Sequence, residues 1–272
     1  MTASGYSNLQ LRVMSALVLA AVVLFVTWLG GLPFRILAAA IAGAMFFEWT
    51  AMTPGGLKTS PAVHAGAFAV VLAAIVFGVT AVWLLAAILI VGLAAATYAE
   101  TRGQGVWLAK GFAYAALSGF ALALLRADTQ SGLVAILFLF AVVWITDIAA
   151  YFAGRSLGGP KLAPAISPGK TWSGAVGGTI GGVTGGMIIA HMAGAASYGI
   201  FLVALLLSIV AQFGDLFESS VKRRAGVKDS GNLIPGHGGV MDRVDGLVAA
   251  AIALYVIGAL GGGLDHPASA LF

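Results

Sequence analysis

The chain contains no cysteine among its 272 residues. Disulfide bonds, thiolate nucleophiles and zinc sites with cysteine ligands are therefore excluded. Histidine is also scarce, and the four histidines lie far apart in the sequence, so no helix-spaced pair is present to hold a metal ion (His64, His191, His237 and His266). A zinc site is not expected.

Charged residues are also scarce in this sequence. Only 9% of the residues are charged, 60% are hydrophobic, and the mean hydropathy is +1.02. Soluble domains carry about 25% charged residues, so most of this chain must lie in lipid rather than in water. The net charge of +4 does not indicate a nucleic-acid partner, because the basic residues lie between apolar runs, as membrane topology requires.

Long apolar runs are abundant, and a membrane-spanning helix needs about 20 such residues. Nine windows qualify, at residues 11–30, 33–52, 62–79, 81–99, 106–125, 131–152, 173–194, 198–218 and 243–262. The first run is too long for a signal peptide and no cleavage site follows it, so we expect a retained helix. The sequence predicts an all-α, polytopic transmembrane bundle of about nine spans. Eight spans remain an alternative, because only residues 78–80 separate the third window from the fourth.

The basic residues orient these spans. Nine spans place the two ends of the chain on opposite sides of the membrane. If the amino terminus is cytoplasmic, only Arg35 and Arg126 of the 14 basic residues lie outside, and the other twelve face the cytoplasm. This asymmetry follows the positive-inside rule. We therefore expect a cytoplasmic amino terminus, a carboxy terminus outside, and a bacterial inner membrane as the location.

The window at 173–194 carries two rows of glycine with a spacing of four residues. The rows are Gly174, Gly178, Gly182 and Gly186, and Gly177, Gly181 and Gly185. Rows of small residues let helix backbones approach closely in lipid. We expect packing against neighbouring helices rather than ligand binding, and a homodimer face is one elaboration.

Acidic residues near a membrane are costly and are functional candidates. Eight of the ten acidic residues fall on the predicted cytoplasmic side, and six of them follow residue 140. We therefore divide the chain into residues 1–130, five scaffold spans, and residues 131–272, four spans with a site at their cytoplasmic face.

Two segments of the second half begin this site. Asp147 lies about two helical turns before Arg155, where pairing with a neighbouring helix is the structural alternative to function. The segment 158–171 resembles a phosphate-binding P-loop, but Pro164 stands where that motif needs glycine and no strand is expected before it. What remains is a stiff loop with Lys161, Ser167, Lys170 and Thr171, suited to phosphate oxygens or to anchoring at lipid headgroups.

The end of the eighth window carries a polar stripe. Asp215, Glu218, Ser219 and Lys222 follow at i, i+3, i+4 and i+7, so they share one face if the helix continues. After a glycine-rich loop, Asp242 and Asp245 open the ninth window, where a helix dipole alone would favour them. Together these groups suit a magnesium-bound nucleotide, because magnesium takes one or two carboxylates plus phosphate oxygens.

Residues 219–245 resemble the signature of the phosphatidate cytidylyltransferase (CDP-diacylglycerol synthase) family. The pattern is Ser, Lys-Arg, Lys-Asp, Pro-x-His-Gly-Gly and Asp-Arg-x-Asp, running from Ser219 to Asp245. Further similarity covers residues 146–155, 167–173 and 214–215, whereas the first 130 residues match only as apolar spans.

The resemblance implies that CTP and phosphatidic acid give CDP-diacylglycerol and pyrophosphate. Mg²⁺, for which Mn²⁺ can substitute, would be held by Asp215 and Asp242, with Asp245 and Glu218 as further candidates and room for a second cation. Asp147, Lys170, Asp215 and Asp242 would be catalytic. Substrate contacts would come from the remaining signature residues and the preceding loop: Ser167, Thr171, Ser219, Lys222, Arg223, Lys228, Asp229, His237 and Arg243.

Other functions predict other features. A CDP-alcohol phosphotransferase needs an arginine that residues 245–250 lack, so that function is rejected. A transporter predicts internal repeats and midplane charges, whereas here the charges gather at one face. A CTP-dependent enzyme for an isoprenoid lipid, similar to CDP-archaeol synthase or polyprenol kinase, remains an alternative.

Overall fold

The computed structural model describes residues 8–234 and 238–272. Within this part, helices dominate, with one short hairpin and one 3-10 helix. The elements in chain order are α1 (Asn8–Leu29), α2 (Gly31–Ala51), α3 (Pro61–Val76), α4 (Ala81–Glu100), α5 (Gly105–Arg126), α6 (Gln130–Leu157), β1 (Lys161–Ala163), β2 (Ser167–Thr171), α7 (Trp172–Met192), α8 (Tyr198–Ala225), α9 (Met241–Gly262) and η1 (Pro267–Ala270).

Each predicted apolar window contains one helix, so the all-α prediction is confirmed. Seven helices are long and apolar enough to cross a membrane, whereas α3 and the Leu17–Leu29 part of α1 are shorter apolar segments. The third and fourth windows form two helices, because the chain turns at Gly78, whose φ of 68° favours glycine. The chain therefore does not continue as a single helix through both windows, and the number of membrane crossings stays a prediction.

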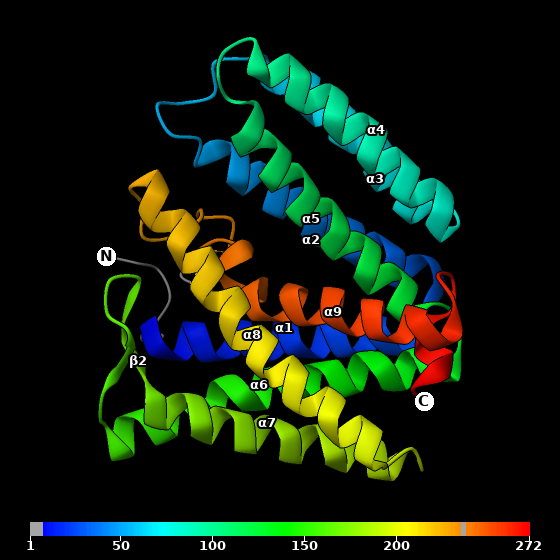
Figure 1. Cartoon of the computed structure of the whole chain (residues 1–272), viewed down its shortest axis with the longest axis vertical. Coiled ribbons are helices and arrows are strands. Elements are labelled where there is room, and N and C mark those ends of the chain that lie inside the picture. Colours follow the sequence, from blue (N-terminus) through cyan, green and yellow to red (C-terminus); the bar gives the residue numbers. More distant parts are fainter. Residues whose placement is uncertain (1–7, 235–237) are drawn as a thin grey trace.

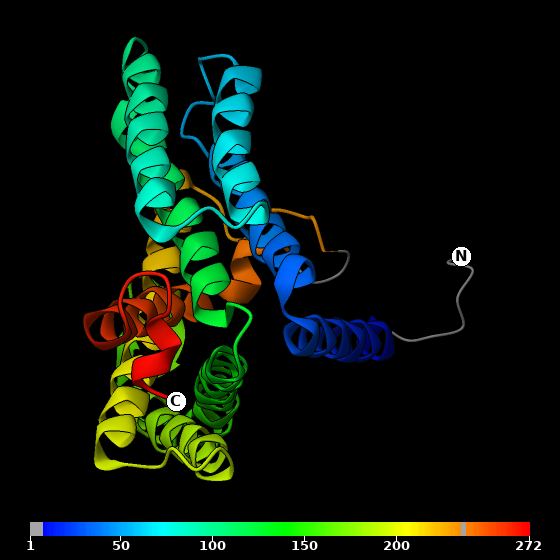
Figure 2. The same ribbon diagram turned by 90° about the vertical axis from the view of Figure 1, so that its right-hand side faces the viewer.

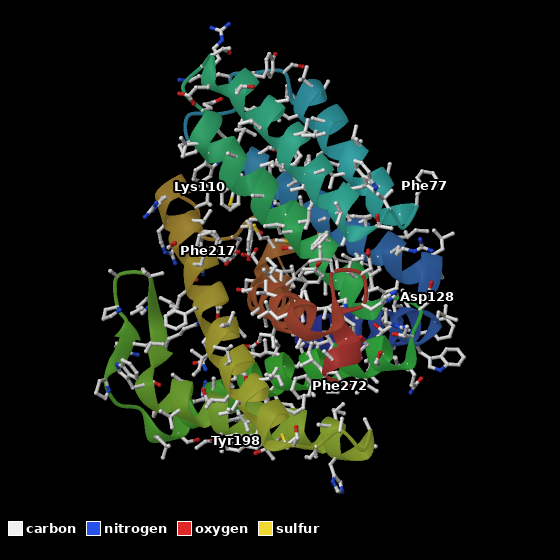
Figure 3. The ribbon with its side chains drawn as sticks, turned by 45° about the vertical axis from the view of Figure 1, so that its right-hand side comes forward. Phe77, Lys110, Asp128, Tyr198, Phe217 and Phe272 are labelled. Carbon is white, nitrogen blue, oxygen red and sulfur yellow. The ribbon has the colours of Figure 1, made fainter. Side chains whose placement is uncertain are left out.

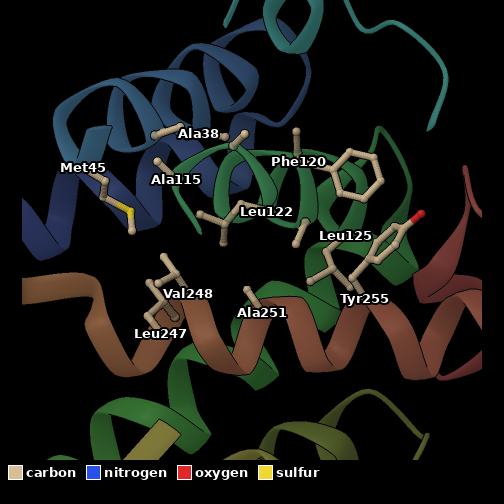
Figure 4. Packing of buried hydrophobic residues seen from close by; sticks show 14 of the residues in the cluster. Ala38, Met45, Ala115, Phe120, Leu122, Leu125, Leu247, Val248, Ala251 and Tyr255 are labelled. Carbon is tan, nitrogen blue, oxygen red and sulfur yellow. The ribbon is translucent and has the colours of Figure 1, made fainter. Parts of the chain in front are cut away.

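The helices form two groups. Helices α2 to α5 pack together, α6 to α9 form the second group, and α1 stands apart from the main body (Figures 1 and 2). Helices α5 and α9 join the groups through apolar side chains. Figure 4 shows Leu122 and Leu125 of α5 facing Leu247 and Ala251 of α9, and all four are buried. This contact places the start of α9 beside the first group.

The glycine rows of α7 pack against α6, as predicted. A Cβ atom on Gly178 would lie 2.8 Å from the Thr146 carbonyl oxygen, and one on Gly182 would lie 2.7 Å from that of Val142. The second row faces α6 as well, since Gly177 lies against Ala153 and its successors follow. Because α6 covers both rows, a homodimer would need another face.

Two features differ from the expected helix-and-loop pattern. Helix α8 continues to Ala225, seven residues beyond its apolar window (225 − 218), and so carries the polar stripe in helical form. The segment predicted as a loop contains the hairpin β1–β2, in which Lys161 pairs with Thr171 and Ala163 with Ser167. Pro168 and Gly169 disfavour strands, so no local pattern of residues predicts this hairpin.

Helix ends gather at two opposite ends of the molecule. Phe77 and Asp128 mark one end, and Lys110 and Phe217 lie toward the other (Figure 3). A cavity of about 440 Å³ at the first end is lined by the segments that join α1 to α2, α3 to α4 and α5 to α6, and by His266. The second end holds the hairpin, the end of α8 and the start of α9 (Figure 1).

Candidate active site

The predicted site residues lie at the second end, on four elements distant in the chain. Asp147 lies on α6, Lys170 on β2, Asp215 on α8 and Asp242 on α9. His237, also predicted, falls outside the described residues.

A cavity of about 660 Å³ lies among the end of α6, the hairpin, α7 and α8. Its lining contains the predicted Asp147, Lys170 and Asp215, and also Arg155 and Lys161. Three cationic side chains and two carboxylates around one cavity suit a phosphate-rich ligand, because ammonium and guanidinium groups form charge-assisted hydrogen bonds with phosphate oxygens. The structure thus brings together residues that are up to 68 positions apart (215 − 147).

One ion pair crosses this cavity. Lys170 on β2 donates to Asp215 Oδ2 on α8. Both side chains are partly exposed, at 26% and 31%. The charges of Asp147 and Asp215 also act on each other, and that of Lys170 acts on Asp147. The hairpin therefore delivers a cation to a group of carboxylates on two helices.

A second, drier ion-pair group lies one turn further along α8. Lys222 Nζ lies 2.6 Å from Asp242 Oδ1 and 2.7 Å from Glu218 Oε2, with side chains only 13%, 8% and 0% exposed. The single positive charge of this lysine is thus shared by two buried carboxylates. Within the described part of the chain, neither Glu218 oxygen accepts a hydrogen bond of good geometry, so Glu218 depends on the lysine charge.

Asp242 has further partners in the loop that precedes α9. Its Oδ2 accepts from Ser230 N and Ser230 Oγ, both at 3.0 Å, and from Gly239 N at 2.9 Å. These bonds hold the two ends of the loop together. Three donors of the loop and Lys222 thus surround the Asp242 carboxylate, so both of its oxygens already have partners within the protein.

The carboxylates are a suitable donor set for magnesium, which prefers oxygen ligands. In residues 8–234 and 238–272, no three carboxylates or histidines are close enough to hold one ion together. Asp245 interacts electrostatically with Asp147, Asp215 and Glu218. An ion shared by Asp215 and Asp242, with Asp245 and Glu218 as further candidate ligands, therefore stays a prediction.

The other predicted residues take varied positions. Thr171 is buried and its Oγ1 accepts from Gly174 N, which caps α7. Arg223 donates to the Val227 carbonyl oxygen at 3.4 Å. Ser167 begins β2, and Ser219 lies half-buried on α8. Exposed side chains on the loop and at the start of α9 complete the set: Lys228, Asp229 and Arg243.

Besides Arg155, two more residues of this region were not predicted as site residues. Gln212 lines the cavity and donates to Thr179 Oγ1 at 3.0 Å. An amide inside an apolar span is itself a signal, so Gln212 could have been found. Ser230 could not, because serine in a glycine-rich loop is ordinary and only its buried position beside Asp242 distinguishes it.

Comparison with known proteins agrees with this geometry. Residues 10–260 match the model of the cytidylyltransferase family. The chain belongs to the cytidylyltransferase family. Among its relatives, the phosphatidate cytidylyltransferase of Brucella suis biovar 1 (strain 1330) is 47% identical, with 98% of this chain and 99% of that protein covered.

More distant cytidylyltransferases match over part of their length. The phosphatidate cytidylyltransferase of Haemophilus influenzae is 40% identical over 152 residues, or 51% of this chain and 53% of that protein. The protein of the same name from Bacillus subtilis (strain 168) is 44% identical over 133 residues, or 48% of this chain and 49% of that protein. The resemblance inferred from residues 219–245 is confirmed.

Proposed function

We propose that this cytidylyltransferase transfers the cytidylyl group of CTP to phosphatidic acid, giving CDP-diacylglycerol and pyrophosphate. The observation that carries the proposal is the cavity at the end of the bundle, which combines Lys170, Arg155 and Lys161 with Asp147 and Asp215. Apolar helices of membrane-spanning length lead directly into this cavity. A lipid phosphate and a nucleotide triphosphate can therefore meet there.

The reaction needs no covalent enzyme intermediate, since the lipid phosphate is already an anionic nucleophile. One of its oxygens attacks the α-phosphorus of CTP, and the bond from that phosphorus to the bridging oxygen breaks as pyrophosphate leaves. Catalysis of this kind is mainly positioning and charge neutralisation. Lys170 is placed to bind phosphate oxygens in the cavity, while Arg223 and Lys228 lie outside it on exposed positions.

The oxygen donors of this site's carboxylates are of the kind that a divalent cation prefers. Asp215 would hold Mg²⁺ or Mn²⁺ together with Asp245 or Asp242, and Glu218 is a candidate ligand for a second cation. The ion would supply neutralisation of the phosphate charge. Lys170 would then orient the phosphates from the hairpin side of the cavity, with Asp147 on α6 as a nearby supporting carboxylate.

Removal of divalent cations gives the first prediction. Excess EDTA should abolish product formation, because a magnesium-dependent site loses its main counter-charge, and added Mg²⁺ should restore the reaction. The measurement is the initial rate of product formation before and after chelation. Retention of the full rate in excess EDTA would contradict the proposed metal requirement.

The membrane arrangement is part of the proposal. Nine crossings, with the amino terminus in the cytoplasm and the carboxy terminus outside, would place this site at the cytoplasmic face of a bacterial inner membrane. Its support is the alternation of helix ends, since the segments after α1, α3 and α5 line a single cavity at the far end. CTP would then reach the site from the cytosol.

The lipid substrate is tested by direct comparison. Purified protein is given labelled CTP and Mg²⁺ with either phosphatidic acid or an isoprenoid glycerol ether phosphate. The proposal predicts a labelled CDP-lipid and equimolar pyrophosphate with phosphatidic acid. Product from the isoprenoid lipid alone would assign the site to a different lipid class.

A further inference from the structure

Helix α2, in the half of the chain expected to be a scaffold, contributes a buried carboxylate to the loop before α9. Glu48 is 1% exposed. Its Oε1 accepts from Val240 N at 2.7 Å, and its Oε2 accepts from Met241 N at 2.8 Å and from Ser230 Oγ at 2.9 Å. These partners lie 182 to 193 residues further along the chain.

The backbone part of this contact caps α9. The first amide groups of a helix have no partner within the helix, and Val240, which precedes α9, has no polar side chain with which to cap it. Glu48 supplies the acceptor from another helix, and its negative charge suits the positive end of the helix dipole. A buried carboxylate is costly unless donors surround it, so three donors on one side chain indicate a specific connection.

The side-chain part of the contact reaches the candidate active site. Ser230 Oγ lies 2.9 Å from Glu48 Oε2 and 3.0 Å from Asp242 Oδ2. A hydroxyl group carries one hydrogen, so Ser230 donates it to one carboxylate at a time and stands between them. Asp242 in turn holds Lys222. Glu48 is therefore linked to a lysine of the α8 stripe by three successive contacts, through Ser230 and Asp242.

Two glycines of the signature loop are shaped by Glu48. A Cβ atom on Gly239 would lie 2.6 Å from each Glu48 oxygen, and one on Gly231 would lie 2.9 Å from Oε1. Real Cβ atoms essentially never come so close. The backbone can thus approach Glu48 closely only where the residue has no side chain. This close approach explains why glycine occupies both positions, independently of the hydrogen bonds.

We infer that Glu48 is a positioning residue for cytidylyl transfer. It fixes the start of α9 and both ends of the preceding loop, and thereby sets where Asp242, Asp245 and Lys222 stand relative to the cavity. Helix α2 is then part of the catalytic architecture rather than a scaffold alone. The expected effect on kcat rests on the proposed function, whereas the expected effect on the structure of the loop and of the start of α9 does not.

The test is Glu48→Gln, which keeps the size of the side chain and replaces one acceptor by an NH₂ group facing backbone amides. A displacement of about 1 Å in a site can cost about 100-fold in rate. We expect kcat with CTP and phosphatidic acid to fall between about 10-fold and 100-fold. Deuterium uptake of a peptide covering residues 239–247 should become at least about 10-fold faster, because the amide of either Val240 or Met241 loses its acceptor and faces an NH₂ group instead.

Glu100→Gln is the matched control. Glu100 also ends a helix and caps the next one, since its Oε2 accepts from Gly105 N at 3.0 Å, but it does not touch the loop before α9. This variant should keep the wild-type kcat and the wild-type exchange of residues 239–247. A loss of kcat equal to that of Glu48→Gln would mean that any cap at this end matters, and would overturn the specific role.

The remaining outcomes separate the two claims. Unchanged kcat and unchanged exchange in Glu48→Gln would overturn the inference, whatever the substrate. An inactive wild type with faster exchange in Glu48→Gln would refute the proposed function while supporting the structural link. If Glu48→Gln does not fold, Ser230→Ala decides, because it removes only the bridging hydroxyl: a lower kcat supports the inference, and the wild-type kcat overturns it.

Discussion

Lys170 and Lys222 each form an ion pair with a carboxylate of α8, but the two ion pairs differ in their exposure to solvent. The pair Lys170–Asp215 lines a cavity and is partly exposed, whereas Lys222 is nearly buried with Glu218 and Asp242. An exposed ion pair contributes about 0–1 kcal/mol to stability. Removal of one partner from a buried pair costs about 3–5 kcal/mol, because the other charge is left without compensation.

This contrast gives a prediction for each lysine. Lys222→Met should lower the free energy of unfolding in detergent by about 3–5 kcal/mol, as measured by denaturant titration. Lys170→Met should change it by no more than about 1 kcal/mol and should reduce turnover by about 100-fold or more through lost charge stabilisation. Equal stability effects for the two variants would contradict the difference in burial.

At this scale the sequence predicts contacts that follow helical spacing and misses those that do not. The spacing of four residues predicts that Glu218 and Lys222 share a face, and they form an ion pair. The contact of Glu48 with Ser230 joins residues 182 positions apart. No periodicity carries that information, because only the tertiary packing of α2 against the loop creates it.

At the scale of elements, the contact between α6 and α7 depends on glycine. Gly182 lies under the Thr146 side chain and the Val142 carbonyl oxygen, beside Ser208. Thr146 and Ser208 form a buried hydrogen bond of 2.8 Å that ties α6 to α8. Three helices that lead to the cavity therefore meet at one glycine.

Gly182→Ala tests this packing. The added methyl group has no free space, and we expect a loss of about 1–3 kcal/mol, typical of overpacking, measured as the free energy of unfolding in detergent. Gly66→Ala in α3 is the matched control, because nothing lies within 4 Å of its Cβ position, and alanine is the better helix former. A neutral Gly182→Ala would contradict the close contact.

The helices themselves were predictable because apolar length is a strong signal in a membrane protein. The extension of α8 to Ala225 was predictable too, because the polar residues of the stripe are spaced as on one face of a helix. The hairpin β1–β2 was not predictable. Its strands are short and contain Pro168 and Gly169, so the pairing depends on the fixed ends of α6 and α7 rather than on local preference.

For the whole molecule, the alternation of helix ends predicts the topology. A reporter fused after Phe272 should be active outside the cytoplasm, and one inserted between Thr53 and Ser60 should be active inside it. The basis is the asymmetry of basic residues together with the gathering of the α1, α3 and α5 ends at one cavity. A cytoplasmic reporter after Phe272 would show that the number of crossings is even.

The central claim is that the carboxylates where α8 and α9 meet support cytidylyl transfer to a lipid phosphate. The direct measurement is the formation of labelled CDP-lipid from CTP, phosphatidic acid and Mg²⁺ by the wild type and by Asp215→Asn, with Asp128→Asn at the far end of the molecule (Figure 3) as the control. We predict product from the wild type and the control, and a loss of about 100-fold or more for folded Asp215→Asn. A wild type that makes no CDP-lipid, or an Asp215→Asn variant with near-normal turnover, would contradict the claim.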